Sequence, residues 1–581
     1  MVSGYAIATL VLFILSIIFV IQPAYIPLPR TRWRIPINLT TAPILAIAIL
    51  WAAQCIDPYV IRTGIVGSDG VKPYNILILF FSLAYMAITL DITGILQSAA
   101  FWVSNKGGDN GWRLYLYFYL MLTFLSICLG NDPVILSGTV FLVYFTQAAN
   151  LNPDAWLMSE FAAANTASMV LFVGNPTNVV ICEGFNLNNA AFTAYTILPF
   201  LACNFLCFLA LAAQFHDKKY LPRTLPHKEM LNVRAALIDP VSAVVGSVLL
   251  GSALIICILT SFFGVDVWEI SLPFAVAKFV WDICWDFYRG QTGKPMLGRG
   301  LQPVDTKAAL VHDTNNDDAK DAESRRTSQP PSVEKPPISV ANDEQASEKA
   351  PSDRSPTDTL GDASRTRTLV NEKGAPRSTS PSPARTSEKT AAADEPQTLL
   401  ARTSARLDAW YGRGLYHFPT FFTALPRLPF ALVPFAFSQF ILIEALAHQG
   451  WIEIFARWLV IASEREMYAV VWLVGVLGVL LCNFAGTNIG ATILLTEIVR
   501  AAELEPSVFR GAAIALAVAS NIGAVSFTFS ASLAGLLWRG ILGQKGIKFT
   551  QRRFAVWNLF PLLVMTIAGL AVVSAEMAVL Y

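Results

Sequence analysis

Long apolar runs, each of the length that crosses a bilayer, recur along most of the chain. The first covers residues 5–22 and lacks the short apolar core and small-residue cleavage site of a signal peptide, so we expect a transmembrane helix there. Further spans are predicted near residues 38–56, 74–95, 155–182, 190–214, 237–262, 268–287, 428–448, 508–538 and 553–578. This pattern predicts an all-α polytopic membrane protein with about ten crossings.

Two other apolar regions, near residues 111–150 and 466–500, are broken midway by polar residues. The first break is Gly130-Asn131-Asp132-Pro133, and the second covers residues 483–488. Backbone groups freed by such a break cannot face lipid, where each unpaired group costs several kcal/mol. We therefore expect two re-entrant hairpins with the breaks at their tips; a pair of ordinary helices in each region is the alternative.

Polar segments follow both hairpins in the same order. Asn131 is followed by the stretches 163–168 and 174–178, and Asn483 is followed by 519–524 and a Ser/Thr-rich stretch, 526–532. Each half thus contains a hairpin, then a helix with a polar interruption, within five predicted crossings. Because five is odd, the second copy enters the membrane from the opposite side, as in the inverted repeats of secondary transporters. We predict repeats at residues 1–236 and 237–581.

Residues 290–426 interrupt the second repeat. Within them, 301–400 contain no Phe, Trp or Tyr and are rich in Ser, Pro and Asp, so this stretch cannot bury a core and is expected to be a disordered loop. Lys and Arg in the short loops place this insert in the cytoplasm and both chain termini outside. Ser328 follows two arginines, a pattern that kinases read, although a simple tether is the favoured interpretation of the loop.

Composition narrows the class of protein. Only 14% of the 581 residues are charged and 54% are hydrophobic, which excludes a water-soluble globule. A net charge of +1 argues against a nucleic-acid partner. The eight cysteines form no CxxC pair and the five histidines have no metal-ligand spacing, so we expect neither a metal cofactor nor an enzyme. A complete P-loop is absent, and coupling to ATP would require a separate soluble ATPase.

The polar breaks suit a ligand that is bound without full charges. A half-helix that begins within the membrane presents free N–H groups and about half a positive charge, while amides and hydroxyls cost less to bury than ions. The candidate substrate- or ion-binding residues are Asn131, Asp132, Asn165, Thr166, Gly174, Asn175, Thr177, Asn178, Asn483, Thr487, Asn488, Ser520, Asn521, Ser530 and Ser532. Asp132 is the one carboxylate among them, and we expect it to couple or gate transport.

Other acidic residues in the predicted spans have simpler interpretations. Asp91 is expected at a helix end near the cytoplasmic interface, with proton carriage as the alternative, and Glu444 has no evident partner. Lys278, Asp282 and Asp286 follow one another at a spacing of four residues. This spacing predicts an ordinary stripe of ion pairs within one helix.

At the four polar clusters the chain resembles the ion transporter superfamily, in its branch of arsenite-pump-like and citrate-transporter-like membrane proteins. The resemblance implies a scaffold and a transport domain, with substrate and ions held between the hairpin tips and the broken helices. Members of the family move arsenite, antimonite, silicate, di- or tricarboxylates, sulfate, or sodium and protons. The Ser-Asn-Thr signature of the dicarboxylate branch occurs here only as Gly-Asn-Asp and Cys-Asn-Phe. This change shifts the expectation towards a weakly charged oxyacid such as arsenite, or towards cation coupling.

We therefore expect a secondary active transporter of an anion or oxyacid, arsenite-like or a carboxylate, that works by alternating access. Na⁺, H⁺ or the membrane potential would drive it. A sodium/proton antiporter is the alternative within transport, and a membrane sensor or scaffold that uses the insert is the alternative from another class. The expected partners are the lipid bilayer and the small substrate, and the sequence leaves a homodimer and a soluble ATPase open.

Overall fold

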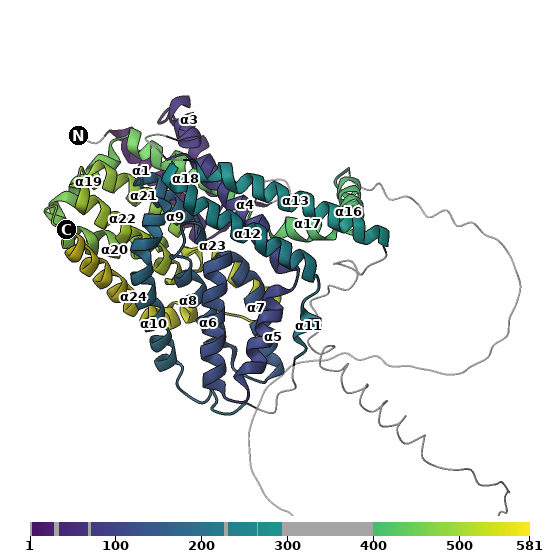
Figure 1. Ribbon diagram of the computed structural model, residues 1–581. Coiled ribbons are helices and arrows are strands. Elements are labelled where there is room, and N and C mark those ends of the chain that lie inside the picture. The colour runs from purple at the N-terminus through teal and green to yellow at the C-terminus, as the bar shows by residue number, and fades with distance from the viewer. Residues whose placement is uncertain (1–2, 28–33, 68–70, 226–230, 264, 293–398) are drawn as a thin grey trace, which may run out of the picture. The chain divides into compact units, whose positions relative to one another are not determined.

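The computed structural model describes residues 3–27, 34–67, 71–225, 231–263, 265–292 and 399–581. The described residues up to Thr292 and from Leu407 onwards belong to one compact unit. Within this unit the helices pack into one body (Figure 1). The predicted phosphorylation site Ser328 lies outside the described residues.

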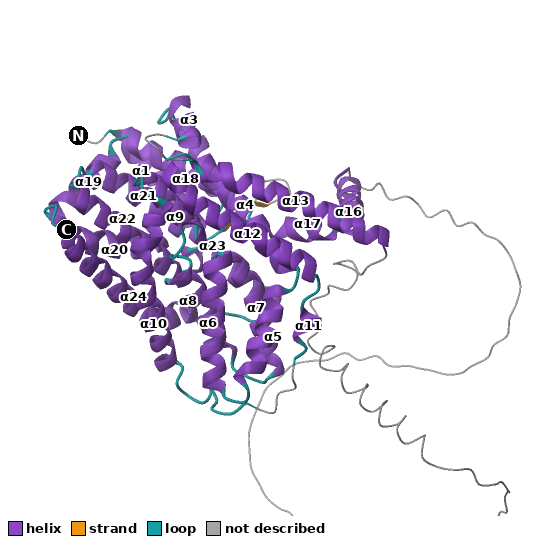
Figure 2. Cartoon of the chain, in the orientation of Figure 1, coloured by secondary structure: helices purple, strands orange, loops and turns teal. Residues whose placement is uncertain are grey.

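Nearly all described elements are helices, and the two short strands pair with each other (Figure 2). The α-helices are α1 Gly4–Ile21, α2 Thr41–Ala52, α3 Pro58–Val66, α4 Pro73–Ile92, α5 Ile95–Gly107, α6 Gly111–Leu129, α7 Asn131–Ala148, α8 Pro153–Ala167, α9 Pro176–Gly184, α10 Asn189–Gln214, α11 Val233–Ala236, α12 Pro240–Thr260, α13 Val267–Thr292, α16 Leu399–His417, α17 Pro419–Ala424, α18 Leu432–His448, α19 Trp451–Ser463, α20 Met467–Phe484, α21 Asn488–Ala501, α22 Pro506–Ile522, α23 Leu533–Gln544 and α24 Gln551–Leu580. The remaining elements are the 3₁₀ turns η1 Phe172–Gly174, η2 Ser261–Phe263, η3 Leu425–Arg427, η4 Gly523–Val525 and η5 Phe529–Ala531, and the strands β1 Ala24–Pro27 and β2 Arg34–Ile37.

The predicted all-α membrane protein is confirmed. Within the described ranges, nine helices are long and apolar enough to cross a membrane, and large apolar side chains on α1, α12 and α24 lie exposed where lipid would cover them. The span predicted at 38–56 is only 12 residues of helix, Thr41–Ala52. The predicted insert also ends earlier than expected, because α16 and α17 are helical and aromatic residues there, such as Phe422, pack on Trp410 and Tyr411.

The helices begin and end at residues whose chemistry favours a terminus. Asp57 accepts a hydrogen bond from the Val60 amide at the start of α3, and Asn110 does the same for Arg113 in α6. Gly130 and Gly486 have φ of 84° and 87°, a conformation that L side chains rarely adopt. These two glycines separate α6 from α7 and α20 from α21, so both predicted hairpins are interrupted where the sequence indicated.

The elements of the two halves follow the same order and pack on each other reciprocally. In the first half α6 and α7 form a hairpin, the broken segment α8–η1–α9 follows, and α10 ends the half; α20 to α24 repeat this order with η4 and η5 in the break. The helix α9 packs on α21 of the other hairpin, and α23 packs on α7. The last helices, α10 and α24, lie side by side (Figure 1).

The helices outside the hairpins exchange partners in a similar way. The helix α4 packs on α12, α13 and α17, whereas α18 packs on α1, α2 and α3. In this comparison α12, α13 and α17 of the second half correspond to α1, α2 and α3 of the first. The insert then falls in the connection between α13 and α17, whereas the corresponding connection between α2 and α3 consists only of residues 53–57. The inverted relation of the halves and their boundary at residues 236 and 237 stay predictions.

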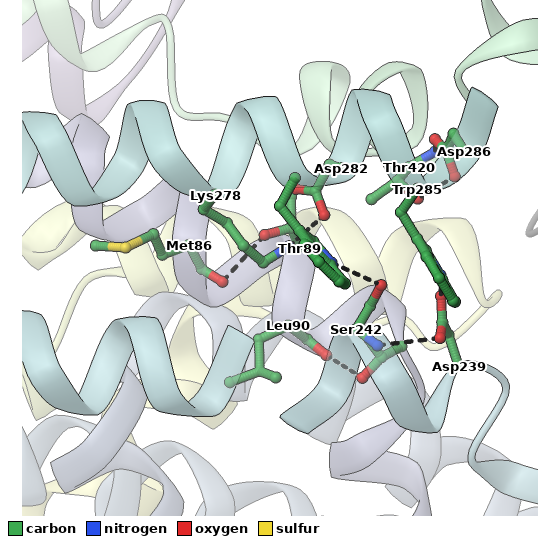
Figure 3. Close-up of polar contacts among 12 residues, drawn as sticks. Met86, Thr89, Leu90, Asp239, Ser242, Lys278, Asp282, Trp285, Asp286 and Thr420 are labelled. Carbon is green, nitrogen blue, oxygen red and sulfur yellow. Dashed lines mark hydrogen bonds and ion pairs between the residues drawn. The ribbon is translucent and has the colours of Figure 1, made fainter. Parts of the chain in front are cut away.

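A buried charge network crosses the helix α13 (Figure 3). Lys278 and Asp282 form an ion pair, and their side chains are 0% and 1% exposed. The Tyr85 hydroxyl on α4 donates to Asp282 at 3.0 Å. Asp286 accepts hydrogen bonds from the backbone N–H and the hydroxyl of Thr420 on α17, at 2.9 and 3.0 Å. The network therefore joins three helices, and the predicted stripe within one helix describes only part of it.

The same network reaches α12 through Asp239. Arg289 and Asp239 form an ion pair at 2.6 Å, the Trp285 indole donates to Asp239 at 2.9 Å, and Asp239 accepts from the Ser242 amide at 3.1 Å (Figure 3). The spacing of four residues correctly puts the charges on one face of α13. The spacing does not show whether the charged face of α13 points towards solvent or into the protein. The charged side chains are buried because α13 packs on α4 and α12.

We predict that Asp282→Ala destabilises the protein strongly, by about 3–5 kcal/mol, because it leaves the Lys278 ammonium buried without its partner. The matched control is Asp266→Ala, whose ion pair with Lys72 has side chains 38% and 43% exposed and is expected to contribute less than about 1 kcal/mol. Thermal unfolding of the purified protein in detergent measures both. Equal losses of stability in the two variants would contradict the prediction.

Candidate functional site

The first hairpin tip lies against the break in the following helix. Gly130 ends α6, and its amide donates to the Ser126 carbonyl at 3.0 Å. A Cβ placed on Gly130 would meet the Gly174 carbonyl of η1 at 3.4 Å. Gly174 itself leaves no room for a side chain, because a Cβ there would lie 2.3 Å from the Ser168 carbonyl. Two backbone segments that are far apart in the sequence thus come together at this tip.

Asn131 and Asn165, both candidates from the sequence, meet at the same tip. Asn131 is the first residue of α7, and its Nδ2 donates to Asn165 Oδ1 at 3.1 Å. Asn165 Nδ2 donates in turn to the Phe161 carbonyl within α8 at 2.8 Å. Both asparagines are buried, so the amides are held in fixed orientations.

Asp132 occupies the first turn of α7, directly after the tip. Its side chain is half-buried, and it has no hydrogen-bond or ion-pair partner among the residues that the structure describes. The N-terminus of α7 favours a negative charge at this position. The corresponding first turn of α21 contains no acidic residue, so this carboxylate distinguishes the first tip from the second.

The second tip differs from its predicted alignment. Thr487 caps α21 by accepting from the Gly490 amide at 3.4 Å, and Asn488 begins the helix. Asn488 Nδ2 donates to the Ser520 carbonyl at 3.3 Å. The helix starts therefore make Asn488 the counterpart of Asn131, whereas the sequence comparison placed Asn483 in that position.

Asn483 instead belongs to the last turn of α20. Its Oδ1 accepts hydrogen bonds from the Phe527 and Thr528 amides at 3.2 and 3.1 Å and from the Thr528 hydroxyl at 3.0 Å. Its Nδ2 donates to Ser526 Oγ at 2.5 Å. Asn483 thus holds the backbone of the break between α22 and α23.

Asn521 joins the two broken segments. Its Oδ1 accepts from the Ser168 hydroxyl at 2.8 Å and from Asn175 Nδ2 at 3.2 Å. Its Nδ2 donates to Asn178 Oδ1 at 2.7 Å and to the Ala517 carbonyl at 2.9 Å. All the polar capacity of this amide is used, and the resulting buried cluster connects the two halves of the chain.

The other candidate residues lie around this cluster. Ser520 donates to Thr177 Oγ1 at 3.3 Å, which adds a second link between the halves. Thr166 Oγ1 donates to Met565 Sδ on α24 at 3.3 Å. Ser532 caps α23 through the Gly535 amide, and Ser530 donates to Thr528 Oγ1 at 3.3 Å. The candidate residues therefore form three groups. Two groups lie at the hairpin tips, and the third, the centre, surrounds Asn521 between the two broken segments.

The site contains little formal charge. Amides and hydroxyls dominate it, and Asp132 is its only candidate carboxylate. Within the described ranges no group of three or more His, Cys, Asp or Glu side chains could hold a metal ion. The groups at the tips for which no hydrogen-bond partner is described are the Asp132 carboxylate and the N–H groups of Asn131 and Asn488, which favour an anion or a polar neutral ligand.

Sequence reasoning missed three polar residues of the site and one buried acid. Ser168, Ser526 and Thr528 were not among the candidates, although they accept or donate the central hydrogen bonds. Glu160 on α8 is fully buried, and Thr139 Oγ1 on α7 lies 3.0 Å from both of its carboxylate oxygens. A carboxylate within a predicted membrane span was the available signal for this residue.

Asp91 lies in the last turn of α4, and its side chain also contacts residues of two other elements. It accepts a hydrogen bond from Ser137 on α7 and forms an ion pair with Arg427 at 3.3 Å. These residues line a cavity of about 510 Å³ together with residues of α5, α6 and α23. The cavity therefore lies where α4 and η3 meet the first hairpin.

Two interrupted hairpins, each followed by an interrupted helix with polar side chains at the break, are an arrangement typical of secondary transporters. Comparison with known proteins agrees with this class. Residues 10–283 match the model of the citrate transporter family. The chain is thus similar to the arsenite-pump-like and citrate-transporter-like membrane proteins of the ion transporter superfamily, and the resemblance predicted from its sequence is confirmed.

Individual relatives are distant and match in part. The chain is 26% identical over 182 residues to an arsenical pump membrane protein of Escherichia coli, which covers 30% of this chain and 42% of that protein. It is 23% identical over 266 residues to the arsenical pump membrane protein of Escherichia coli strain K12, covering 44% and 61%. A 46 kDa membrane protein of Mycobacterium leprae is 24% identical over 118 residues, covering 20% and 28%. The chain thus matches less than two thirds of the length of each of these relatives.

We predict that Asn521→Ala destabilises the protein by about 2–4 kcal/mol, because it leaves Ser168, Asn175 and Asn178 buried without their partner. Thr166→Val is the matched control, since it removes only a contact with a methionine sulfur and should cost less than about 1 kcal/mol. Thermal unfolding in detergent compares the two. A loss in Thr166→Val as large as that in Asn521→Ala would argue against a central role for this amide.

Proposed function

We propose that the protein is a secondary active transporter that moves a small anion or oxyacid across a membrane by alternating access. The observation that carries this proposal is the pair of hairpin tips, each of which begins a helix with an asparagine that bonds to the broken segment of its own half. The N–H groups of Asn131 and Asn488 belong to these helix starts, where the backbone favours negative charge.

A weakly charged substrate fits this site better than a multivalent anion. A carboxylate such as Asp132, about 6 Å from a bound monoanion at an effective dielectric of about 20, opposes binding by about 3 kcal/mol, and a dianion doubles this cost. A coupling cation or proton at Asp132 would remove it. The names of the relatives, arsenical pump and citrate transporter, support an oxyacid or carboxylate as the substrate class.

The packing supports a division into two bodies that move relative to each other. Hairpins and broken segments interlock through α9 with α21 and α23 with α7, which favours their movement as one transport domain. The helices α4 and α18, with the partners described above, would form the scaffold. An ion that crosses 100 mV contributes about 2.3 kcal/mol per charge, sufficient to drive such a movement with a gradient of substrate.

The specific observation that favours a second candidate, a sodium/proton antiporter, is the free carboxylate of Asp132 in the first turn of α7. A group of this kind binds a proton or a cation without any anion being present. In this case the amides would orient the carboxylate and coordinate the cation, and no oxyacid would be transported.

Flux measurements on the full chain in proteoliposomes separate the two candidates. Arsenite, citrate, sulfate and sodium are compared in parallel with an imposed pH gradient, sodium gradient or membrane potential. We expect accumulation of at least one of the first three, dependent on one of the imposed gradients. Exchange of sodium for protons without movement of arsenite, citrate or sulfate would replace the proposed function by the antiporter.

We predict that Asp132→Asn abolishes the dependence of transport on pH or sodium, because the amide has the same shape but binds no proton and attracts a cation much less. The matched control is Glu453→Gln on the exposed surface of α19, which should behave as the unchanged chain. Size-exclusion chromatography and thermal unfolding verify that both variants are folded. If the dependence survives in Asp132→Asn, this residue is not the coupling group.

A further inference from the structure

Glu160 is a buried carboxylate without a described cationic partner. It lies in the middle of α8, and its side chain is fully buried. Thr139 is its hydrogen-bond donor on α7, and no Lys or Arg in the described part of the chain pairs with it. A charge in such a place is costly, and binding a proton removes that charge.

Gly138 lines a cavity together with Asp91 and Ser137, and the Glu160 carboxyl group lies directly behind this glycine without lining the cavity itself. A Cβ at position 138 would lie 2.6 Å from Glu160 Oε1, so even an alanine would displace the carboxyl group. The missing side chain therefore leaves Glu160 separated from the cavity of about 510 Å³ by a glycine backbone. Polar residues at the cavity, including Gln97 and Lys545, are compatible with water in it.

In the other direction Glu160 approaches the proposed binding site. Thr139 meets Glu160 and Asn131 meets Asn165, so α7 and α8 pack antiparallel with the acid between the cavity and the tip. Glu160 precedes Asn165 by five residues, which is about 7.5 Å along a helix. At about 10 Å and an effective dielectric of about 20, its charge changes the affinity for a monoanion by on the order of tenfold.

We propose that Glu160 is the proton-carrying residue of the transporter. It takes a proton from water in the cavity at Gly138, and its neutral form favours the anion at the hairpin tip, so that proton and anion cross together. The proton returns to water on the other side when the site opens there. This inference rests on the proposed function. Glu160 would carry the proton between the cavity and the site, and Asp132 would act at the hairpin tip itself.

The surroundings of Glu160 contain few groups that could take over this role. The elements packed against α8 are α6, α7, α10, α22, α23 and η4. Their titratable and charged side chains near this part of the fold, together with the ion pair at the start of α8, are Tyr115, Tyr119, Asp132, Cys203, Cys207, Arg539, Lys545 and the pair Asp154–Arg553. Lys545 is bonded to Tyr144 at 2.7 Å and Arg539 lies over the Phe529 ring, so neither neutralises Glu160.

Carbodiimide labelling tests the proton site without any substrate. Dicyclohexylcarbodiimide is apolar and adds to a protonated carboxyl group, and rearrangement leaves a stable N-acylurea that peptide mass spectrometry locates. In the purified full chain we expect labelling of Glu160 at pH 6 that falls severalfold at pH 8. Glu160→Gln should lose the label on this peptide.

The glycine provides a matched pair of variants for the same measurement. Gly138→Ala should reduce labelling of Glu160 severalfold, because the added Cβ displaces the carboxyl group from its position behind the glycine that lines the cavity. Gly251→Ala on α12, where a Cβ would meet nothing within 4 Å, should label as the unchanged chain does. Absence of label on Glu160 at both pH values, or equal labelling in the two alanine variants, would overturn the proposal.

Transport measurements then test whether anion uptake is coupled to the protonation of Glu160. Sulfate uptake into proteoliposomes is measured at pH 6 and pH 8, where the charge of sulfate does not change. Because sulfate is a dianion, the effect is larger than for a monoanion, and we expect uptake at least tenfold faster at pH 6 in the unchanged chain, equal rates at both pH values in Glu160→Gln, and partial recovery of the difference in Glu160→Asp. A full tenfold difference in folded Glu160→Gln would overturn the role of Glu160.

The two proposals fail in distinguishable ways. If the unchanged chain moves none of arsenite, citrate or sulfate, the proposed function is wrong, and the labelling result alone decides whether Glu160 binds a proton from the cavity. If an anion is transported and pH dependence persists without Glu160, the proposed function stands and the inference about this residue is wrong.

Discussion

The structure depends on one constraint: backbone groups released by a break in a membrane helix must find partners inside the protein. Asparagine amides supply them. Asn178 Nδ2 donates to the Ser168 and Leu171 carbonyls at 2.8 Å each, and Asn483 Oδ1 accepts from two amides of the other break. These side chains replace the hydrogen bonds that a continuous helix would make. The candidate site is therefore first of all the means by which two broken helices exist in a membrane.

This structural duty limits how the asparagines can bind a ligand. Asn521 uses both its oxygen and its nitrogen in hydrogen bonds to Ser168, Asn175, Asn178 and its own helix. An ion or oxyacid that bound there would have to replace bonds that hold the two halves together. The tips are less constrained, because Asp132 and the N–H groups of Asn131 and Asn488 keep their polar capacity. Binding at the tips and support at the centre are thus separate tasks for similar residues.

Much of this arrangement could be predicted from the sequence, and the failures have physical causes. Apolar length and polar breaks give the helices and the interruptions between them, and the repeated polar clusters single out Asn131 and Asn165, although not their contact. Asn488 was misaligned because the turn is set by the backbone at Gly486, which a comparison of residue types does not register. The direction of the charged face of α13 and the burial of Glu160 depend on which helix packs on which, and a single helix does not encode this.

The interlocked halves also have a consequence for synthesis of the protein. Asn178 and Asn521 are 343 residues apart, so at about 5–20 residues per second the ribosome needs roughly 20–70 s to make the partner after Asn178 has been made. Throughout that time the first broken segment must wait in the membrane without its amide partners. We therefore expect a helper protein or a water-filled insertion site to shield those polar groups, and the length of the insert between α13 and α16 extends the delay.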